Sequence, residues 1–302
     1  MLPTRRSGIS CVRHLDTSAR RSNNRGERRV RPEITPSEIL DYYAGGQEEQ
    51  RLTAAAGRLE WIRTWELLER FLPPPPARIL DVGGGTGIYA LPLAARGYRV
   101  HLIDAAPNHV ERARALSSAS RHPLTAAEVG DARRLPIPDG AVDVVLLFGP
   151  LYHLIERADR VAALREAHRV LADGGLLLAA CISRFASAYA GIQEGVLRDP
   201  SFASIVDGDL RNGIHRNPTS RPEWFTTAFF HRPDEIAPEI DDGGLMFERL
   251  VPIEGPGWMS RDLDGWLNDA AARDRLLHVV RQLETEPSLI GASAHLLAVA
   301  RR

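Results

Sequence analysis

The sequence predicts an α/β protein built on a doubly wound, mainly parallel sheet. Short apolar, β-branched segments alternate with amphipathic segments of helical spacing along residues 78–302. Such alternation favours parallel strands joined by right-handed helical crossovers. A glycine-rich turn at residues 83–87 also joins the first strand directly to a helix-like segment, and a strand–turn–helix unit of this kind is typical of doubly wound sheets.

A helical segment is expected to precede the sheet. Thr35 followed by Pro36 indicates a helix start, because threonine caps helices well and proline is favoured in the first turn. Apolar residues then recur at helical spacing over residues 39–72, with an expected break at Gly45 and Gly46. The prolines at 73–76 should end this segment, since proline cannot continue a helix.

The other elements are expected in regular alternation. Apolar, β-branched runs bounded by turn residues predict strands at residues 78–82, 98–104, 125–129, 142–148, 176–182, 247–253 and 295–300. Amphipathic spacing predicts helices at residues 88–96, 107–119, 156–171, 233–240 and 270–284. Residues 183–232 are too long for a plain connection and are rich in aromatic and basic side chains. We therefore expect them to form a lid at the carboxyl edge of the sheet.

The glycine turn indicates a ligand site. Gly83, Gly85 and Gly87 remove side chains from a turn that opens a helix, so backbone amides there can approach a ligand closely. Asp81 lies just before the turn. An acid at this place should repel a pyrophosphate and suits a ligand that carries an ammonium or sulfonium charge.

Composition limits the class of protein. A chain of 302 residues with 44% apolar and 25% charged residues is typical of a soluble globular protein with one large or two small domains. No apolar run approaches the roughly 20 residues that span a bilayer. Cys11 and Cys181 lie far apart in the sequence, which predicts neither a disulfide framework nor a zinc site and fits a reducing cytoplasm.

The charge is unevenly distributed. Residues 1–31 hold nine arginines against Asp16 and Glu27, a net charge of +7, whereas the whole chain carries −1, so residues 32–302 are near −8. An acidic body disfavours a nucleic-acid partner, because phosphates must be neutralised by basic groups. The basic segment is predicted to be a disordered tail, with an RNA-binding arm, a targeting peptide or translation from Val30 as alternatives.

Four separated motifs resemble one known family. Leu80-Asp81-Val82-Gly83-Gly84-Gly85-Thr86-Gly87 is similar to its first motif, and Asp104 ends the second predicted strand. Gly130-Asp131-Ala132 with the proline-rich turn after it, and residues 143–154 around the fourth strand, match two further motifs. Over roughly residues 35–302 the chain thus resembles a class I S-adenosylmethionine-dependent methyltransferase, which implies a seven-stranded sheet with an antiparallel last strand.

The resemblance implies a role for each motif residue, with S-adenosylmethionine lying across the carboxyl ends of the strands. Gly83, Gly85 and Gly87 would contact its methionine part, and Asp81 would help to orient its ammonium group. The remaining implied contacts are Asp104 and Ala105 at the ribose, Asp131 and Ala132 at the adenine, Phe148 and Gly149 near the sulfonium, and Tyr43 on the N-terminal helix. For each aspartate the alternative is that it only caps a helix or turn.

Candidate acceptor-side residues lie in two places. Tyr152 and His153 follow the fourth strand, where the methyl group should point, and His153 is the first candidate for a general base. His215 in the predicted lid is a further candidate base. Arg216 suits a substrate carboxylate or phosphate, and the other candidate substrate contacts are His231, Phe229 and Tyr189. For His153 the alternative is a hydrogen bond to neighbouring backbone that holds the loop, and for the lid residues it is packing, a surface position or a structural salt bridge.

Other functions were weighed against methyl transfer. Residues 85–90 fit the dinucleotide fingerprint, but a dehydrogenase explains neither Asp131 nor the final pair of strands. No metal-ligand cluster is expected from the sequence. The hypothesis is a cytoplasmic monomer or homodimer that methylates oxygen, nitrogen or carbon of a small molecule. A cofactor-binding regulatory or assembly protein without methyl transfer and an RNA methyltransferase are the alternatives.

The expected organisation follows from these assignments. Residues 1–31 form the basic tail, residues 32–76 form an N-terminal helical cap, and residues 77–302 form the methyltransferase domain with the lid at residues 183–232 inside it. After methyl transfer the cofactor would leave as S-adenosylhomocysteine.

Overall fold

A computed structural model describes residue 39, residue 42 and residues 55–302 of the chain. These residues belong to one of two units into which the chain divides, residues 34–302. The predicted basic tail, the helix start at Thr35 and the break at Gly45 lie outside the described residues. Within them, no helix combines the length and the apolar character needed to cross a membrane.

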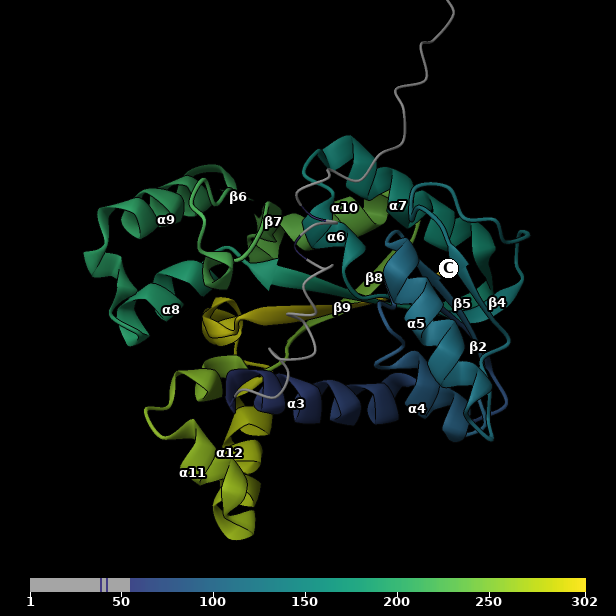
Figure 1. Cartoon of the computed structure of the whole chain (residues 1–302), viewed down its shortest axis with the longest axis horizontal. Coiled ribbons are helices and arrows are strands. Elements are labelled where there is room, and N and C mark those ends of the chain that lie inside the picture. The colour runs from purple at the N-terminus through teal and green to yellow at the C-terminus, as the bar shows by residue number, and fades with distance from the viewer. Residues whose placement is uncertain (1–38, 40–41, 43–54) are drawn as a thin grey trace, which may run out of the picture. The chain divides into compact units, whose positions relative to one another are not determined.

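The sheet confirms the predicted fold class. Five parallel strands lie in the order β3-β2-β1-β4-β5, β9 pairs antiparallel with β5, and β8 pairs antiparallel with β9 (Figure 1). Each of the seven predicted strands is present. Their bounds are β1 Arg78–Val82, β2 Arg99–Asp104, β3 Ala126–Val129, β4 Val142–Leu147, β5 Leu171–Ser183, β8 Met246–Pro252 and β9 His295–Arg301.

Two further strands lie in the insertion after β5 and correct the predicted count. β6 (Ile214–His215) pairs antiparallel with β7 (Ala228–His231), and β7 adds to the carboxyl end of β5 through the parallel pair of Ile182 with Phe230. The described residues therefore form a nine-stranded sheet, where seven strands were expected. β6 has only two residues, too few for a periodic pattern to show in the sequence.

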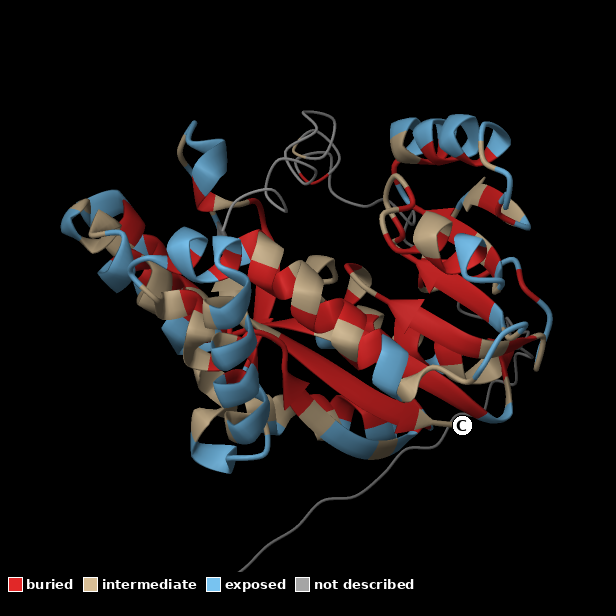
Figure 2. Ribbon diagram, turned by 90° about the horizontal axis from the view of Figure 1, so that it is seen from below, coloured by how far each residue is buried: buried red, intermediate tan, exposed pale blue. Residues whose placement is uncertain are grey.

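The helices cover both faces of the sheet. Their bounds are α3 Ala55–Phe71, α4 Ala90–Ala95, α5 Pro107–Ser118, α6 Pro150–His153, α7 Arg157–Val170, α8 Ala186–Gln193, α9 Pro200–Asn212, α10 Pro233–Asp242, α11 Leu263–Asn268 and α12 Ala270–Leu283. One core lies between the sheet and α7 with α10, and a second lies between the sheet and α3, α4 and α5. The strands and the inward faces of the helices are buried (Figure 2).

Local sequence explains these elements. Residues 144–147 of β4 are all buried, and the continuous Val-Val-Leu-Leu run suits a parallel strand covered on both faces. Pro107 occupies the first turn of α5, where its missing N–H costs no hydrogen bond. The helix predicted at 156–171 is confirmed as α7. Gly174 and Gly175, which follow this helix in the sequence, lie within β5, where Gly174 takes a positive φ of 73°.

α3 is an integral part of the second core. Leu67 and Leu68 on this helix are fully buried. The Arg63 guanidinium is also fully buried, and it donates to the Ile253 carbonyl at 3.0 Å and to the Glu284 carboxylate at 2.7 Å. A buried arginine persists only where its donors are matched by acceptors. These bonds fix α3 against the segments that precede β9.

Candidate functional site

The glycine turn between β1 and α4 combines a tight contact with an open position. Gly83, Gly85 and Gly87 take φ values of 78°, 56° and 91°, which favour glycine. A Cβ atom on Gly83 would lie 2.6 Å from Pro150 Cδ, so this glycine lets the loop after β4 approach. The nearest atom to a Cβ on Gly85 would be His109 Nδ1 at 4.0 Å. Gly85 therefore lines open space suited to a ligand.

Asp81 lies beneath this turn. Its side chain is fully buried, and neither carboxylate oxygen has a hydrogen-bond partner in the described part of the chain. A Cβ on Gly84 would lie 2.8 Å from Asp81 Oδ2. Burial, and secondly the charge of Asp104, raises the pKa of Asp81 to about 7. A cationic group bound at the turn would offset the cost of this isolated carboxylate.

Asp104 at the end of β2 ties the turn to the next strand. Its Oδ2 accepts the Gly85 N–H at 2.8 Å, and its Oδ1 accepts the Ala106 N–H at 2.9 Å. His109 Nδ1 lies 3.4 Å from the same Oδ1; the sequence reading did not include this histidine. A carboxylate has about four acceptor positions, so Asp104 retains capacity for further donors. The predicted neighbour Ala105 is exposed beside it.

Asp131, just after β3, is held by an arginine. Its carboxylate accepts the backbone N–H of Arg133 at 2.8 Å and the guanidinium Nε at 3.0 Å, while Arg133 Nη1 reaches Asp159 at 3.1 Å. Burial alone would raise the pKa of Asp131, but the hydrogen bonds and charge of Arg133 hold it below its ordinary value. Ala132 is buried. An adenine contact at Asp131 would thus share the carboxylate with Arg133.

The loop after β4 brings aromatic groups to the same edge. The Phe148 ring packs edge-on against Tyr89 with centroids 5.4 Å apart. Gly149, with a φ of 134°, leads into α6. Tyr152 and His153 on α6 are half-buried, with ring centroids 4.7 Å apart.

Phe225 in the insertion joins this group. It takes a positive φ of 68°, a strained conformation for a bulky residue. Its ring centroid lies 5.4 Å from that of Tyr42, 6.1 Å from that of His153 and 6.5 Å from that of Phe230. We call Tyr42, Tyr152, His153, Phe225 and Phe230 the aromatic cluster. It joins the loop after β4 to the predicted lid.

His215 is buried within the insertion, with both ring nitrogens engaged. Nδ1 lies 2.9 Å from Asp209 Oδ2, and Nε2 lies 2.8 Å from the Trp224 carbonyl. Its ring stacks on Phe230 with centroids 4.8 Å apart. These contacts favour a structural role for His215, which joins α9, β6 and the turn at Pro222–Trp224.

Phe229 and His231 lie on the opposite face of β7 from Phe230. The Arg160 guanidinium lies 3.6 Å from the centre of the Phe229 ring, and His231 Nε2 lies 3.3 Å from Glu239 Oε2. Burial lowers the pKa of His231. Because alternate residues of a strand point to opposite faces, Phe230 contacts the aromatic cluster while its two neighbours pack toward α7 and α10.

The remaining predicted contacts lie apart from the aromatic cluster or beyond the described residues. Tyr189 on α8 packs against the core formed by Leu59, Trp258 and Leu263. Arg216 is exposed just after β6. Tyr43 lies outside the described residues.

The structure also assembles a group that the sequence did not reveal. Glu60 on α3, Glu254 after β8 and His295 at the start of β9 place carboxylate oxygens and a ring nitrogen within 4.8 Å of one another. His295 Nδ1 lies 2.6 Å from Glu254 Oε1. This is the length of a short charge-assisted hydrogen bond. No local pattern connects these residues, since they are far apart along the chain.

Comparison with known proteins agrees with this architecture. Residues 79–175 match a family model described as a methyltransferase domain. A malonyl-[acyl-carrier protein] O-methyltransferase of Geobacter sulfurreducens is 42% identical over 103 residues, which are 33% of this chain and 37% of the relative. A demethylmenaquinone methyltransferase of Thermus thermophilus is 38% identical over 130 residues, 42% of this chain and 56% of the relative. The chain thus matches well under half of the first relative's length and little more than half of the second's.

A solved structure extends the likeness of fold beyond the glycine turn. An S-adenosylmethionine-dependent methyltransferase of Mesorhizobium loti covers 80% of this chain and 98% of its own length with a TM-score of 0.54 at 18% identity. At this identity the likeness concerns the fold alone. The matched motifs, the sheet order and the family model agree: residues 79–175 form a domain of the methyltransferase family, and the fold is that of class I S-adenosylmethionine-dependent methyltransferases.

Proposed function

We propose that this chain transfers a methyl group from S-adenosylmethionine to a small-molecule acceptor. The observation that carries the proposal is the open position at Gly85, with the Asp104 carboxylate bonded to its amide and the orphaned Asp81 carboxylate buried under the neighbouring Gly84. An orphaned buried carboxylate beneath a turn of amides fits a ligand with an ammonium group beside a carboxylate. The aromatic cluster begins at the same carboxyl edge of the sheet.

The turn and the acids at the strand ends would each contact a different part of the cofactor. When bound, the cofactor supplies a sulfonium methyl group that is already activated for transfer. Asp81 would stabilise its ammonium group, Gly83, Gly85 and Gly87 would offer backbone amides, and Asp104 would accept from the ribose hydroxyls. Asp131, together with Arg133, would bind at the adenine. The rest of the cofactor pocket would be lined by Ala105, Ala132, Phe148 and Gly149.

The acceptor would lie against the aromatic cluster. Aromatic faces bury flat, apolar molecules well, and residues 183–232 would act as the lid that excludes water. Tyr152 and His153 would contact the acceptor, and Arg216 would bind an acidic group on it. One relative is named a malonyl-[acyl-carrier protein] O-methyltransferase and another a demethylmenaquinone methyltransferase; the acceptor atom here would be oxygen, nitrogen or carbon.

Two measurements test the proposal on the full chain. Calorimetry with S-adenosylhomocysteine should give one site per chain. Incubation with methyl-labelled S-adenosylmethionine and fractionated cell extract should then place label in a small molecule. Label in RNA, with salt-sensitive binding, would indicate an RNA methyltransferase. Tight cofactor binding without label in any fraction would favour a regulatory protein.

Gly85→Val is the matched negative control for both measurements. Its side chain would enter the open position and impose strain at a φ of 56°. Gly208→Ala, in α9 where a Cβ would come no closer than 3.8 Å to the Ile214 carbonyl, is the neutral counterpart. Binding that survives Gly85→Val would contradict the assigned site.

A further inference from the structure

His295 lies on the same face of the sheet as Phe230 of the aromatic cluster, one strand away, as the strand register shows. Ile182 near the end of β5 pairs with Phe230 of β7 on one side and with His295 of β9 on the other. Paired residues of adjacent strands point to the same face of a sheet, about 5 Å apart. Ile182 itself packs with Tyr152, Phe225 and Phe230. The His295 side chain therefore projects from the face and the edge where an acceptor would lie.

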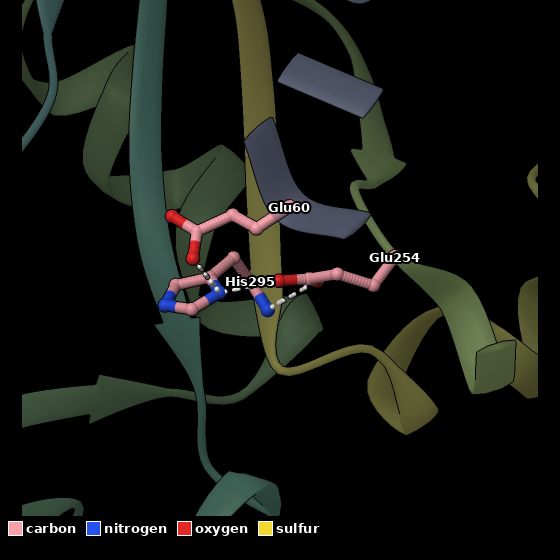
Figure 3. A group of neighbouring side chains, drawn as sticks. All are labelled: Glu60, Glu254 and His295. Atoms are coloured by element: carbon pink, nitrogen blue, oxygen red, sulfur yellow. Dashed lines mark hydrogen bonds and ion pairs between the residues drawn. The ribbon is translucent and has the colours of Figure 1, made fainter. Parts of the chain in front are cut away.

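The surroundings of His295 fix which ring nitrogen carries a proton. Nδ1 lies 2.6 Å from Glu254 Oε1 and 3.7 Å from Glu60 Oε2. A carboxylate only accepts, so the short contact requires a proton on Nδ1. Figure 3 shows both carboxylates directed at this side of the ring, with the other nitrogen, Nε2, pointing away from them. In a neutral ring Nε2 then carries the lone pair.

Glu254 is built to hold this orientation. It is buried, and its Oε2 accepts the Ser293 hydroxyl at 2.8 Å and the His295 backbone N–H at 3.0 Å. Burial would raise the pKa of Glu254, but the charge and hydrogen bonds of His295 keep it below its ordinary value. Arg63 donates to the carbonyl of Ile253, next to Glu254, and is itself paired with Glu66 and Glu284. An ionised Glu254 would stabilise the imidazolium formed when Nε2 takes up a proton.

We propose that His295 is the proton acceptor of the methyl-transfer site, with Glu254 as its positioning residue. The proposal rests on the proposed function and adds a base that the sequence did not indicate. In the step, the acceptor's hydroxyl, amine or acidic C–H gives its proton to Nε2 of His295. The electron pair so released forms the bond to the methyl carbon, and the pair of the broken carbon–sulfur bond stays on sulfur.

A cation site is the competing interpretation of these three side chains. Two ligands of a cation are normally separated by about 3 Å or more, because each lies 2.0–2.6 Å from the ion at a wide angle. The Nδ1 and Oε1 atoms are closer than that, and both Glu254 oxygens already accept hydrogen bonds. The geometry favours an oriented histidine.

The first test reads the ring directly and does not depend on knowing the acceptor. The ¹⁵N-labelled full chain, saturated with S-adenosylhomocysteine, is titrated from pH 6 to 9 by long-range ¹H–¹⁵N NMR. The His295 signals are assigned by their loss in His295→Asn, whose amide can replace Nδ1–H toward Glu254. We expect a neutral ring with the proton on Nδ1 in the upper part of this range. A proton on Nε2, or a ring charged at both nitrogens up to pH 9, would overturn the proposal.

The second test measures turnover with an acceptor found in the extract screen. His295→Asn should lower kcat by about 10²- to 10⁴-fold while changing the affinity for S-adenosylhomocysteine by less than about twofold, and the acid limb of the pH–kcat profile should disappear. Glu254→Gln should move that limb to lower pH, because the imidazolium loses its counter-charge. His278→Asn, an exposed histidine on α12, is the matched control and should behave as wild type.

The results separate the two proposals. If wild type binds S-adenosylhomocysteine and labels no acceptor, the proposed function fails while the NMR titration still decides the state of His295. If His153→Asn abolishes the acid limb and His295→Asn leaves it in place, His153 is the base and the proposal for His295 is wrong. Circular dichroism and thermal unfolding of each variant exclude loss of fold as the cause.

Discussion

At the scale of single residues, the ionised Asp81 carboxylate should lower the stability of the ligand-free protein and strengthen the binding of a cationic ligand. It lies buried beneath the glycine turn without a hydrogen-bond donor in the described residues. Asp104, at the end of the adjacent strand β2, accepts hydrogen bonds from the backbone amides of Gly85 and Ala106. Both acids lie at the glycine turn, Asp81 under Gly84 and Asp104 at Gly85, but only Asp81 is left without hydrogen bonds in the described residues.

Asp81→Asn should stabilise the ligand-free protein at high pH. The folded-state pKa of Asp81 is about 7, above the ordinary value of 3.8. The contribution of the protonated carboxyl group to stability is therefore complete below pH 3.8 and is lost as the pH rises through 7. A shift of this size corresponds to at most about 4 kcal/mol. Urea unfolding of both proteins from pH 4 to 8 should show the variant gaining on wild type as the pH rises.

The same substitution should weaken S-adenosylhomocysteine binding, since a neutral amide no longer attracts an ammonium group. Calorimetry at pH 8 measures this loss. A variant with unchanged affinity would show that Asp81 has no part in holding the ligand, whatever its effect on stability.

Asp104→Ala tests the ribose contact. Hydrogen bonds to a charged acceptor contribute about 1.5–3 kcal/mol each, so the affinity for S-adenosylhomocysteine should fall by about 30-fold or more. Asp173→Ala, at an almost fully exposed aspartate, controls for loss of negative charge. Affinity equal to wild type in Asp104→Ala would refute the ribose role.

At the scale of elements, β7 decides which aromatic side chains of the insertion join the aromatic cluster. Its pairing with β5 turns Phe230 toward the aromatic cluster and turns Phe229 and His231 toward Arg160 and Glu239. The insertion also has its own polar centre, because Asp209 on α9 binds both Ser187 on α8 and His215 on β6. The insertion is thus a packed unit with one face on the site.

His215→Ala should destabilise this insertion. Removing the ring leaves the Asp209 carboxylate buried without its main partner, and breaking a buried pair in this way costs about 3–5 kcal/mol. Denaturant unfolding, with limited proteolysis of residues 183–232, measures the effect. Arg216→Ala, at the exposed neighbouring position, should change the free energy of unfolding by less than about 0.5 kcal/mol. Equal stability of the two variants would contradict the structural role of His215.

At the scale of the whole molecule, buried ion pairs join helices to the sheet. The Arg160 guanidinium of α7 donates to both carboxylate oxygens of Glu239 on α10, at 2.9 and 2.7 Å, and His231 of β7 meets the same carboxylate. Burial opposes ionisation of Glu239, but these hydrogen bonds and charges lower its pKa to about 2. Three elements therefore share one charged contact.

Acid should release this contact. Because the pKa of Glu239 is lowered from 4.5 to about 2, its contribution to stability is complete above pH 4.5 and is lost as the pH falls toward 2. The free energy of unfolding of wild type should therefore decline over this interval, and Glu239→Gln should decline less steeply. Parallel urea titrations from pH 6 to 2.5 compare the slopes; identical slopes would assign the acid sensitivity to other carboxylates.

The predicted strands are confirmed where the signal was local. Apolar runs such as Val144 to Leu147 and a glycine turn are read over a few residues, and their outcome depends little on distant partners. The strands and helices of the insertion were not predicted. β6 has only two residues, too few to show a period, and its partner β7 follows only after the turn at Pro222–Trp224. Asp131 lies between these two cases. Its partner Arg133 is only two positions away in the sequence, but the two side chains bond only once the turn has folded.

The sequence by itself determined the doubly wound sheet, the glycine turn and the acids at the strand ends, because these depend on backbone conformations and periodicities set by neighbouring residues. Only the tertiary structure decided which side chains meet at the carboxyl edge of the sheet. The register of β5 with β7 and β9 places Phe230 and His295 on either side of Ile182. Packing of α3 on the sheet brings Glu60 to the same histidine. Contacts of this kind join residues far apart along the chain, where no local pattern specifies a partner.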